Sequence, residues 1–110
     1  MLVPEQIEVL VCTEAIDMRK GVDGLVGLVR ELLNEEPLSR KLFVFQSKRR
    51  DRVKILYWHH NGFAVWSKRI QHGRYRFPTS GGSVSLSRRA LRMILEGVDL
   101  NSLILTKKAA

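Results

Sequence analysis

The dipeptide Asn61-Gly62 constrains the fold of this chain more than any other feature of its sequence. It lies between two runs rich in β-branched and aromatic residues, 52–58 and 63–70. Asn-Gly between such runs is the strongest short-range signal for a β-hairpin. We therefore predict two antiparallel strands, with Asn61 and Gly62 at the centre of the turn and His60 opposite Phe63.

This pairing distributes alternate side chains of the hairpin over two faces. One face is apolar near the turn and basic at the far end: it carries Arg52, Lys54, Leu56, Trp58, Val65, Ser67 and Arg69. The other is the expected core face, and carries Val53, Ile55, Tyr57, Trp66, Lys68 and Ile70. The tryptophans and Tyr57 are interpreted as core residues rather than as platforms for stacking bases.

The first of two predicted helices follows a short strand at residues 8–12. Apolar residues recur at spacings of three and four along it, and Asp17 is a suitable N-cap for a helix that runs to about Asn34. Three glycines lie inside this segment, and each costs about 0.8–1 kcal/mol relative to alanine. We therefore expect another stretch of backbone to pack closely against Gly21, Gly24 and Gly27.

The second predicted helix begins after Ser87, a good N-cap, and ends at Gly97. Residues 42–45 supply a strand before the hairpin, and residues 84–86 are a candidate for a further short one. The predicted fold is a small α+β fold. It has a largely antiparallel sheet in the order strand, helix, three-strand meander, helix, with the first helix packed on one face and the second beside it.

The bulk properties fit one globular domain over residues 1–110, with a frayed tail at 101–110. No apolar stretch is long enough to span a bilayer, and the first residues do not resemble a signal peptide. Cys12 is the only cysteine, so no intramolecular disulfide can form. These features predict a cytoplasmic protein, associated with the nucleoid if it binds DNA.

No catalytic or metal-binding pattern is evident in the sequence. The acidic residues have no spacing that would bring carboxylates together, and no phosphate-binding glycine loop is present. His59 and His60 are adjacent, so their side chains should point in opposite directions and cannot chelate one ion. We therefore predict a protein that is not an enzyme, with no metal, no cofactor and no small-molecule substrate.

Charge is distributed unevenly along the chain. Residues 1–39 have a balance of −5, residues 40–76 a balance of +10 and residues 77–110 a balance of +3. Basic side chains neutralise phosphates and release counterions, so a positive segment of this kind is typical of nucleic-acid binding. The candidate nucleic-acid-binding residues are Lys48, Arg49, Arg50, Arg52, Lys54, Lys68, Arg69, Arg74, Arg76, Arg88 and Arg89.

Arg88 and Arg89 are included because they fall in the first turn of the second helix. Positive side chains oppose the helix dipole there, whereas an anion would be stabilised. The alternative interpretation of the whole basic segment is a solvated surface, or one that pairs with the acidic N-terminal third in a homo-oligomer.

An opening motif contains the candidate residues Asp17, Arg19, Lys20, Gly21, Asp23 and Gly24. Further blocks are residues 42–45, residues 49–58, Gly62-Phe63 with Trp66, Lys68-Arg69 and Gly73-Arg74, and a closing block at residues 95–99. Together these blocks resemble the TnpB accessory proteins of the insertion-sequence 66 family. The similarity covers residues 8 to 100. His59-His60 departs from it, because an acidic or small residue is expected after Trp58.

The resemblance implies a small protein needed for transposition beside a separate, larger transposase that holds the catalytic carboxylates. It assigns no role to the opening motif. With the basic segment, it predicts a non-catalytic accessory factor that binds DNA or the transposase–DNA complex. Two alternatives remain open: a module that binds the transposase without touching DNA, and a small RNA-binding regulator with exposed aromatic residues.

Overall fold

The computed structural model describes residues 7–98, which form an α+β fold with one five-stranded sheet. The elements in chain order are β1 (Val9–Cys12), α1 (Val22–Glu31), β2 (Leu42–Gln46), β3 (Arg52–His59), β4 (Gly62–Arg69), β5 (Ser83–Leu86) and α2 (Arg88–Leu95). The strand order across the sheet is β4-β3-β2-β1-β5. Only β1 and β2 are parallel, joined by the α1 crossover, so the predicted fold class is confirmed.

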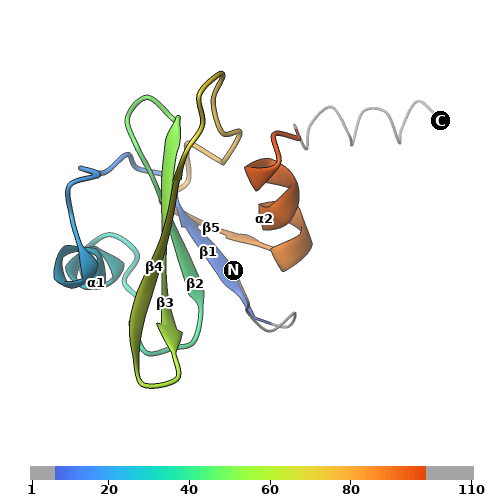
Figure 1. Ribbon diagram of the computed structural model, residues 1–110. Coiled ribbons are helices and arrows are strands. Elements are labelled where there is room, and N and C mark those ends of the chain that lie inside the picture. Colours follow the sequence, from blue (N-terminus) through green and yellow to red (C-terminus); the bar gives the residue numbers. More distant parts are fainter. Residues whose placement is uncertain (1–6, 99–110) are drawn as a thin grey trace.

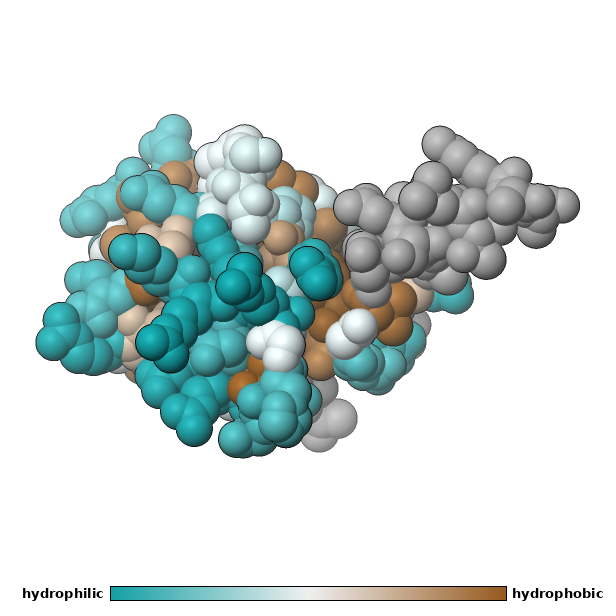
Figure 2. Space-filling view, turned by 90° about the horizontal axis from the view of Figure 1, so that it is seen from above, coloured by the Kyte–Doolittle hydropathy of each residue, from teal (hydrophilic) through white to brown (hydrophobic). Residues whose placement is uncertain are grey.

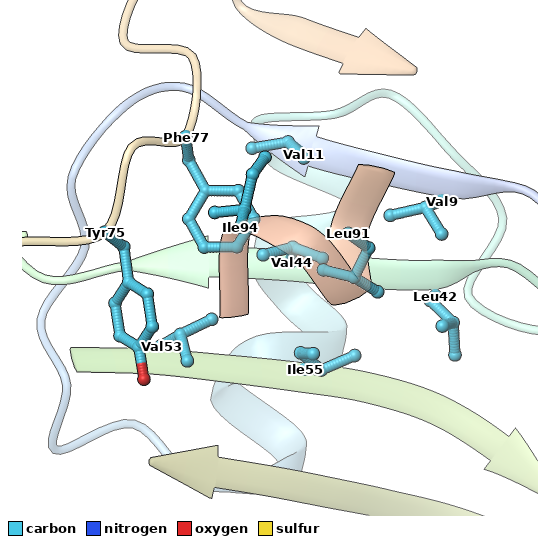
Figure 3. Close-up of a cluster of buried hydrophobic side chains, with 10 residues drawn as sticks. All are labelled: Val9, Val11, Leu42, Val44, Val53, Ile55, Tyr75, Phe77, Leu91 and Ile94. Atoms are coloured by element: carbon cyan, nitrogen blue, oxygen red, sulfur yellow. The ribbon is translucent and has the colours of Figure 1, made fainter. Parts of the chain in front are cut away.

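The two helices cover opposite faces of the sheet (Figure 1). Leu25 and Val29 of α1 pack on one face, in a cluster with Phe43, Phe45 and Leu56. On the other face α2 packs through Leu91 and Ile94 over the valines and isoleucine of β1, β2 and β3 (Figure 3). The expectation that the second helix lies beside the first was wrong. Both faces of the sheet are therefore buried, which the burial of every residue of β1 and β2 reflects.

The first helix is shorter than predicted because Asp17 is not its N-cap. The Asp17 carboxylate instead accepts hydrogen bonds from the backbone N–H and the guanidinium of Arg19, which closes a turn before the helix. Helix α1 begins at Val22 with Gly21 as its N-cap, and no side chain caps it. It ends at Glu31 instead of Asn34, and Asn34 has a left-handed φ of 51°.

Contrary to expectation, no neighbouring backbone of the described residues packs against the three glycines of this region. A Cβ at Gly21 or Gly27 would meet no heavy atom within 4 Å. At Gly24 a Cβ would meet the Lys20 side chain at 3.1 Å. The glycines at 21 and 27 therefore have no packing explanation in this structure.

The β3–β4 hairpin turns one residue earlier than the sequence predicts. His60 and Asn61 are the central residues, so His59 lies opposite Gly62 and Trp58 opposite Phe63. The first central residue, His60, has a φ of 56°, as in type II′ turns. The pairing is shifted by two residues, and a shift of two leaves each side chain on its predicted face. The predicted core face is buried against α2, and the opposite face is also buried, under α1, at Leu56.

The C-terminal elements follow the sequence closely. Strand β5 is present and pairs antiparallel with β1, so it forms the edge of the sheet opposite to the predicted meander. Ser87 caps α2 by accepting a hydrogen bond from the Ala90 N–H, as predicted. Gly97, with a φ of 90°, ends the helix in a Schellman motif, in which the Val98 N–H donates to the Met93 carbonyl. The predicted frayed tail lies outside the described residues.

Candidate nucleic-acid interface

Strand direction brings the basic segments to one end of the sheet. β1, β2 and β4 end there, and β3 and β5 begin there. We call this region the basic end and define it as residues 13–20, 47–54 and 67–82. The opposite end, called the hairpin end, consists of residues 31–41, 59–62 and 86–89.

The basic end carries the whole net charge of the chain. It holds eleven lysines and arginines against Glu14, Asp17 and Asp51, a balance of +8, whereas basic and acidic groups cancel over the rest of the sequence. Figure 2 looks down on this end, and the most hydrophilic side chains gather over its middle. The uneven distribution of charge along the sequence therefore places the net positive charge at one end of the folded protein.

Most of these cations have no ion-pair or hydrogen-bonding partner for their side chains among residues 7–98. In the part of the chain that the structure describes, the ion pairs join Arg19 to Asp17, and Lys41 to Glu8 and Glu35. Asp51 accepts a hydrogen bond from the Ser47 hydroxyl. Exposed side chains that remain available to an external anion are Lys48, Arg49, Arg52, Lys68, Arg69, Arg74 and Arg76.

The β2–β3 loop presents Lys48 and Arg49 to solvent through a tight turn. The Ser47 hydroxyl accepts from the Arg52 N–H, and the Arg50 N–H donates to the Ser47 carbonyl. Arg50 has a φ of 63°, a conformation that costs a residue with a Cβ about 1–2 kcal/mol. Its guanidinium reaches back to the Thr13 carbonyl at 3.4 Å, so Arg50 ties two loops of the basic end together.

Residues 74–77 cross the basic end with alternating side chains. Tyr75 and Phe77 are buried in the core cluster under α2 (Figure 3). Arg74 and Arg76 are exposed to solvent. The buried amide of Gln46 fixes the segment that follows, by donating to the carbonyls of Cys12 and Pro78. The Tyr75 N–H donates to the Arg50 carbonyl at 2.7 Å, which holds this segment against the β2–β3 loop. Burial raises the pKa of the Tyr75 hydroxyl.

A pocket of about 230 Å³ opens on the α1 side of the basic end. Arg52 and Arg69 lie directly opposite each other in β3 and β4, and Lys54 lies opposite Ser67 on the same face. The Lys54 ammonium donates to the Lys20 carbonyl at 2.8 Å, so the pocket adjoins the start of α1. Its lining residues are Met18, Arg52, Lys54, Ser67, Lys68 and Arg69.

The opening motif of residues 17–24 contributes Met18 to the lining of this pocket. The Arg19 guanidinium holds the pKa of the Asp17 carboxyl well below its usual range, and the same contact raises the pKa of Arg19. Asp17 thus neutralises Arg19 in a local turn instead of opposing the cations of the sheet. Met18 is one of the apolar residues that recur along the predicted first helix and were expected to face the core, and its place in the pocket was missed. No signal in the sequence distinguishes the two roles.

Arg88 and Arg89 are not part of this surface. Leu86 lies opposite Val9 in the sheet, at the end remote from Cys12, so α2 begins at the hairpin end. The structure therefore brings together nine of the eleven predicted contact residues and separates the two at the start of α2.

The described residues include neither a cluster of metal ligands nor a membrane-spanning helix. Between residues 7 and 98, no group of three histidine, cysteine or acidic side chains could hold a metal ion. The described helices are also too short and too polar for any of them to cross a membrane. Cys12 is buried in the sheet, and burial raises the pKa of its thiol.

Comparison with known proteins decides the family. The family model for the IS66 Orf2-like protein matches residues 7–104. The chain belongs to the IS66 Orf2-like family. The predicted resemblance is thereby confirmed, and the family indicates an accessory role in the transposition of IS66 elements.

Two relatives from Sinorhizobium fredii (strain NBRC 101917 / NGR234) support this assignment. The uncharacterized protein y4jC is 32% identical over 94 residues, covering 84% of this chain and 80% of that protein. The uncharacterized protein y4hO is 31% identical over 96 residues, covering 86% of this chain and 84% of that protein. No solved structure matches the chain.

Proposed function

We propose that this IS66 Orf2-like protein is a non-catalytic accessory factor that binds the phosphate backbone of DNA through its basic end. The observation that carries the proposal is the concentration of a balance of +8 in residues 13–20, 47–54 and 67–82. A surface of this kind attracts a polyanion from a distance and gains affinity by releasing counterions. In transposition it would act on element DNA, alone or in complex with the separate transposase.

Burial of the aromatic residues favours contacts to the backbone over stacking on unpaired bases. Tyr75 and Phe77, the aromatic residues within the basic end, are each 4% exposed. Trp58 is half-buried near the hairpin turn, where it packs edge-to-face on Phe63 at 5.0 Å. Stacking needs exposed ring faces beside the cations, so the arrangement supports a duplex ligand over single-stranded RNA.

The test is fluorescence anisotropy with a labelled DNA duplex over a series of salt concentrations. Each phosphate contact contributes a slope of about −0.9 to the plot of log affinity against log salt. We expect Lys48→Gln with Arg49→Gln to make this slope shallower by about 1.8 and to weaken binding at low salt.

The matched control is Arg30→Gln with Arg92→Gln, which also removes two exposed cations, but from outside the basic end. Its slope should stay close to that of the unmodified protein. Negligible binding at low salt, or equal losses in both variants, would refute the proposal. If DNA affinity is unchanged in the Lys48/Arg49 variant while co-purification with the transposase is lost, the basic end binds protein and not DNA.

A further inference from the structure

The pocket on the α1 side differs from the rest of the basic end because its cations face one another. Arg52 and Arg69 occupy directly opposite positions of an antiparallel pair, and Lys54 is two residues from Arg52 on the same face. Like charges at opposite positions of a sheet destabilise it. Repulsion among these cations lowers the stability of the protein without a ligand, and an anion bound between them would offset this repulsion.

The acidic groups near this pocket are already engaged elsewhere. The Asp17 carboxylate is held by Arg19 at 2.7 Å, and Asp51 accepts from the Ser47 hydroxyl at 3.2 Å. The Lys54 ammonium has a neutral carbonyl as its partner, which leaves its charge uncompensated. Among the described residues, therefore, no carboxylate neutralises Arg52, Lys54 or Arg69, three of the four cations that line the pocket.

The size of the pocket limits what can occupy it. At about 230 Å³ it is smaller than the ~300–1,000 Å³ of sites that enclose a drug-sized ligand. A phosphate group can enter it end-on. The pocket is half-open to solvent, so the remainder of such a ligand can lie outside it.

We infer that this pocket is a specific site for a phosphate monoester, and that its ligand is the terminal phosphate of a DNA end. A monoester carries about −1.5 to −2 charges at neutral pH, against −1 for a diester, so three converging cations favour it. The inference rests on the proposed function for the identity of the ligand. The chemistry of the pocket would equally admit free phosphate or a mononucleotide.

This assignment gives the opening motif a role in shaping the pocket. The turn closed by Asp17 and Arg19 positions Met18 as an apolar wall, which limits water around the bound anion and strengthens its attraction to the cations. The Lys20 carbonyl anchors the Lys54 ammonium in the pocket. Gly21, the next residue, is the N-cap of α1, and in the described residues no side chain caps the helix there.

The experiment compares two DNA duplexes that differ only in a 5′-phosphate or a 5′-hydroxyl at their ends, with anisotropy as the readout. We expect the phosphorylated duplex to bind about fivefold more tightly at moderate salt. Arg69→Gln should abolish this preference. Arg74→Gln, which removes a cation from the basic end but outside the pocket, should weaken both duplexes alike and preserve it.

Two further measurements separate the pocket from the general surface. Ser67→Glu introduces a carboxylate at an exposed position of the pocket and should also abolish the preference. Millimolar inorganic phosphate should raise the unfolding temperature of the unmodified protein, but not of Ser67→Glu, relative to chloride of equal ionic strength.

Equal affinity for the two duplexes, or equal loss of preference in Arg69→Gln and Arg74→Gln, would overturn the terminal-phosphate site while leaving general DNA binding intact. A different result would be stabilisation of the protein by inorganic phosphate without any binding of DNA. The pocket would then bind a small phosphate, and both the DNA end as its ligand and the proposed function would be wrong.

Discussion

The two ends of the sheet are built from the same strands, yet they treat charge in opposite ways. At the hairpin end Lys41 lies between Glu35 at 2.9 Å and Glu8 at 3.6 Å, and its contact with Glu35 raises the pKa of its ammonium. At the basic end Arg52 and Arg69 lie opposite each other, and among the described residues neither has a carboxylate as an ion-pair partner. Lys41 is therefore neutralised within the protein, whereas Arg52 and Arg69 are not neutralised by any described residue.

The difference shows that the apolar core and the unpaired cations occupy different positions along the strand axis. The core lies in the middle of the sheet, where β1 and β2 are buried on both faces by the two helices. Cations at the strand ends can then repel one another without sharing space with the apolar residues that hold the fold. The following predictions test whether the two ends are as independent as this arrangement implies.

The largest effect is expected from Gln46, which connects the basic end to the core. Its side chain is 1% exposed and bridges the Cys12 and Pro78 carbonyls. We expect Gln46→Ala to lower the free energy of unfolding by about 2–4 kcal/mol, because it leaves a cavity and two carbonyls without a partner. Gln46→Met, which keeps the volume, should cost less. Equal losses in denaturant titrations would show that the hydrogen bonds, not the packing, decide stability here.

A charge reversal should distinguish the contribution of the basic end to DNA binding from that of the rest of the surface. We expect Lys48→Glu with Arg49→Glu to weaken duplex binding about 30- to 100-fold at low salt, since two attractive contacts become repulsive. Arg30→Glu with Arg92→Glu changes the net charge equally but should cost only a few-fold. If affinity fell by the same factor in both variants, net charge and not its placement would govern binding.

The sequence predicts the faces of the strands better than their pairing. Alternation of apolar and polar residues from Arg52 to Arg69 assigned every side chain of the hairpin to its observed face. A pairing shifted by two residues preserves that alternation, so the pattern could not reveal that His60 and Asn61 are the turn centre. The N-cap at Asp17 failed for a related reason. Arg19 is close enough in sequence to hold the Asp17 carboxylate in a local turn. Local sequence preferences do not decide between this turn and an N-cap.

The candidate site was predictable only where neighbouring strands supply it. The β2–β3 loop and the end of β4 share one edge in any antiparallel meander, so Lys48, Arg49 and Arg69 could be grouped from the sequence. The 17–20 segment joins them because β1 pairs parallel with β2, a contact between residues more than thirty apart. Arg88 and Arg89 are excluded because β5 reverses direction. Both facts depend on tertiary pairing, which charge patterning does not encode.

Backbone strain offers a finer comparison, because each end has a residue with a Cβ at positive φ. His60 at the hairpin turn has a φ of 56°, and Arg50 at the basic end has a φ of 63°. Glycine adopts such angles without steric cost, so His60→Gly should raise the free energy of unfolding by about 0.5–1 kcal/mol. Arg50→Gly should gain less or lose, because the contact with the Thr13 carbonyl disappears. Equal gains in thermal unfolding would contradict a structural role for the Arg50 side chain.

The smallest effects concern pH, and the two ends should respond at opposite extremes. The Asp17 carboxyl has a depressed pKa in the folded state, so its contribution is present above the unfolded value of 3.8 and is lost as pH falls below it. Its side chain is 45% exposed and that of Arg19 is 91% exposed, so solvent screens the pair and the loss is slight.

Lys41 has the opposite sign. Its folded pKa is raised, so its contribution is complete below the unfolded value of 10.5 and declines as pH rises beyond it. Unfolding curves of Asp17→Asn should therefore converge on those of the unmodified protein in acid, and those of Lys41→Met in alkali. If the unfolding curves of both variants converged on those of the unmodified protein at the same extreme of pH, the electrostatic contributions of the two ends would not be independent.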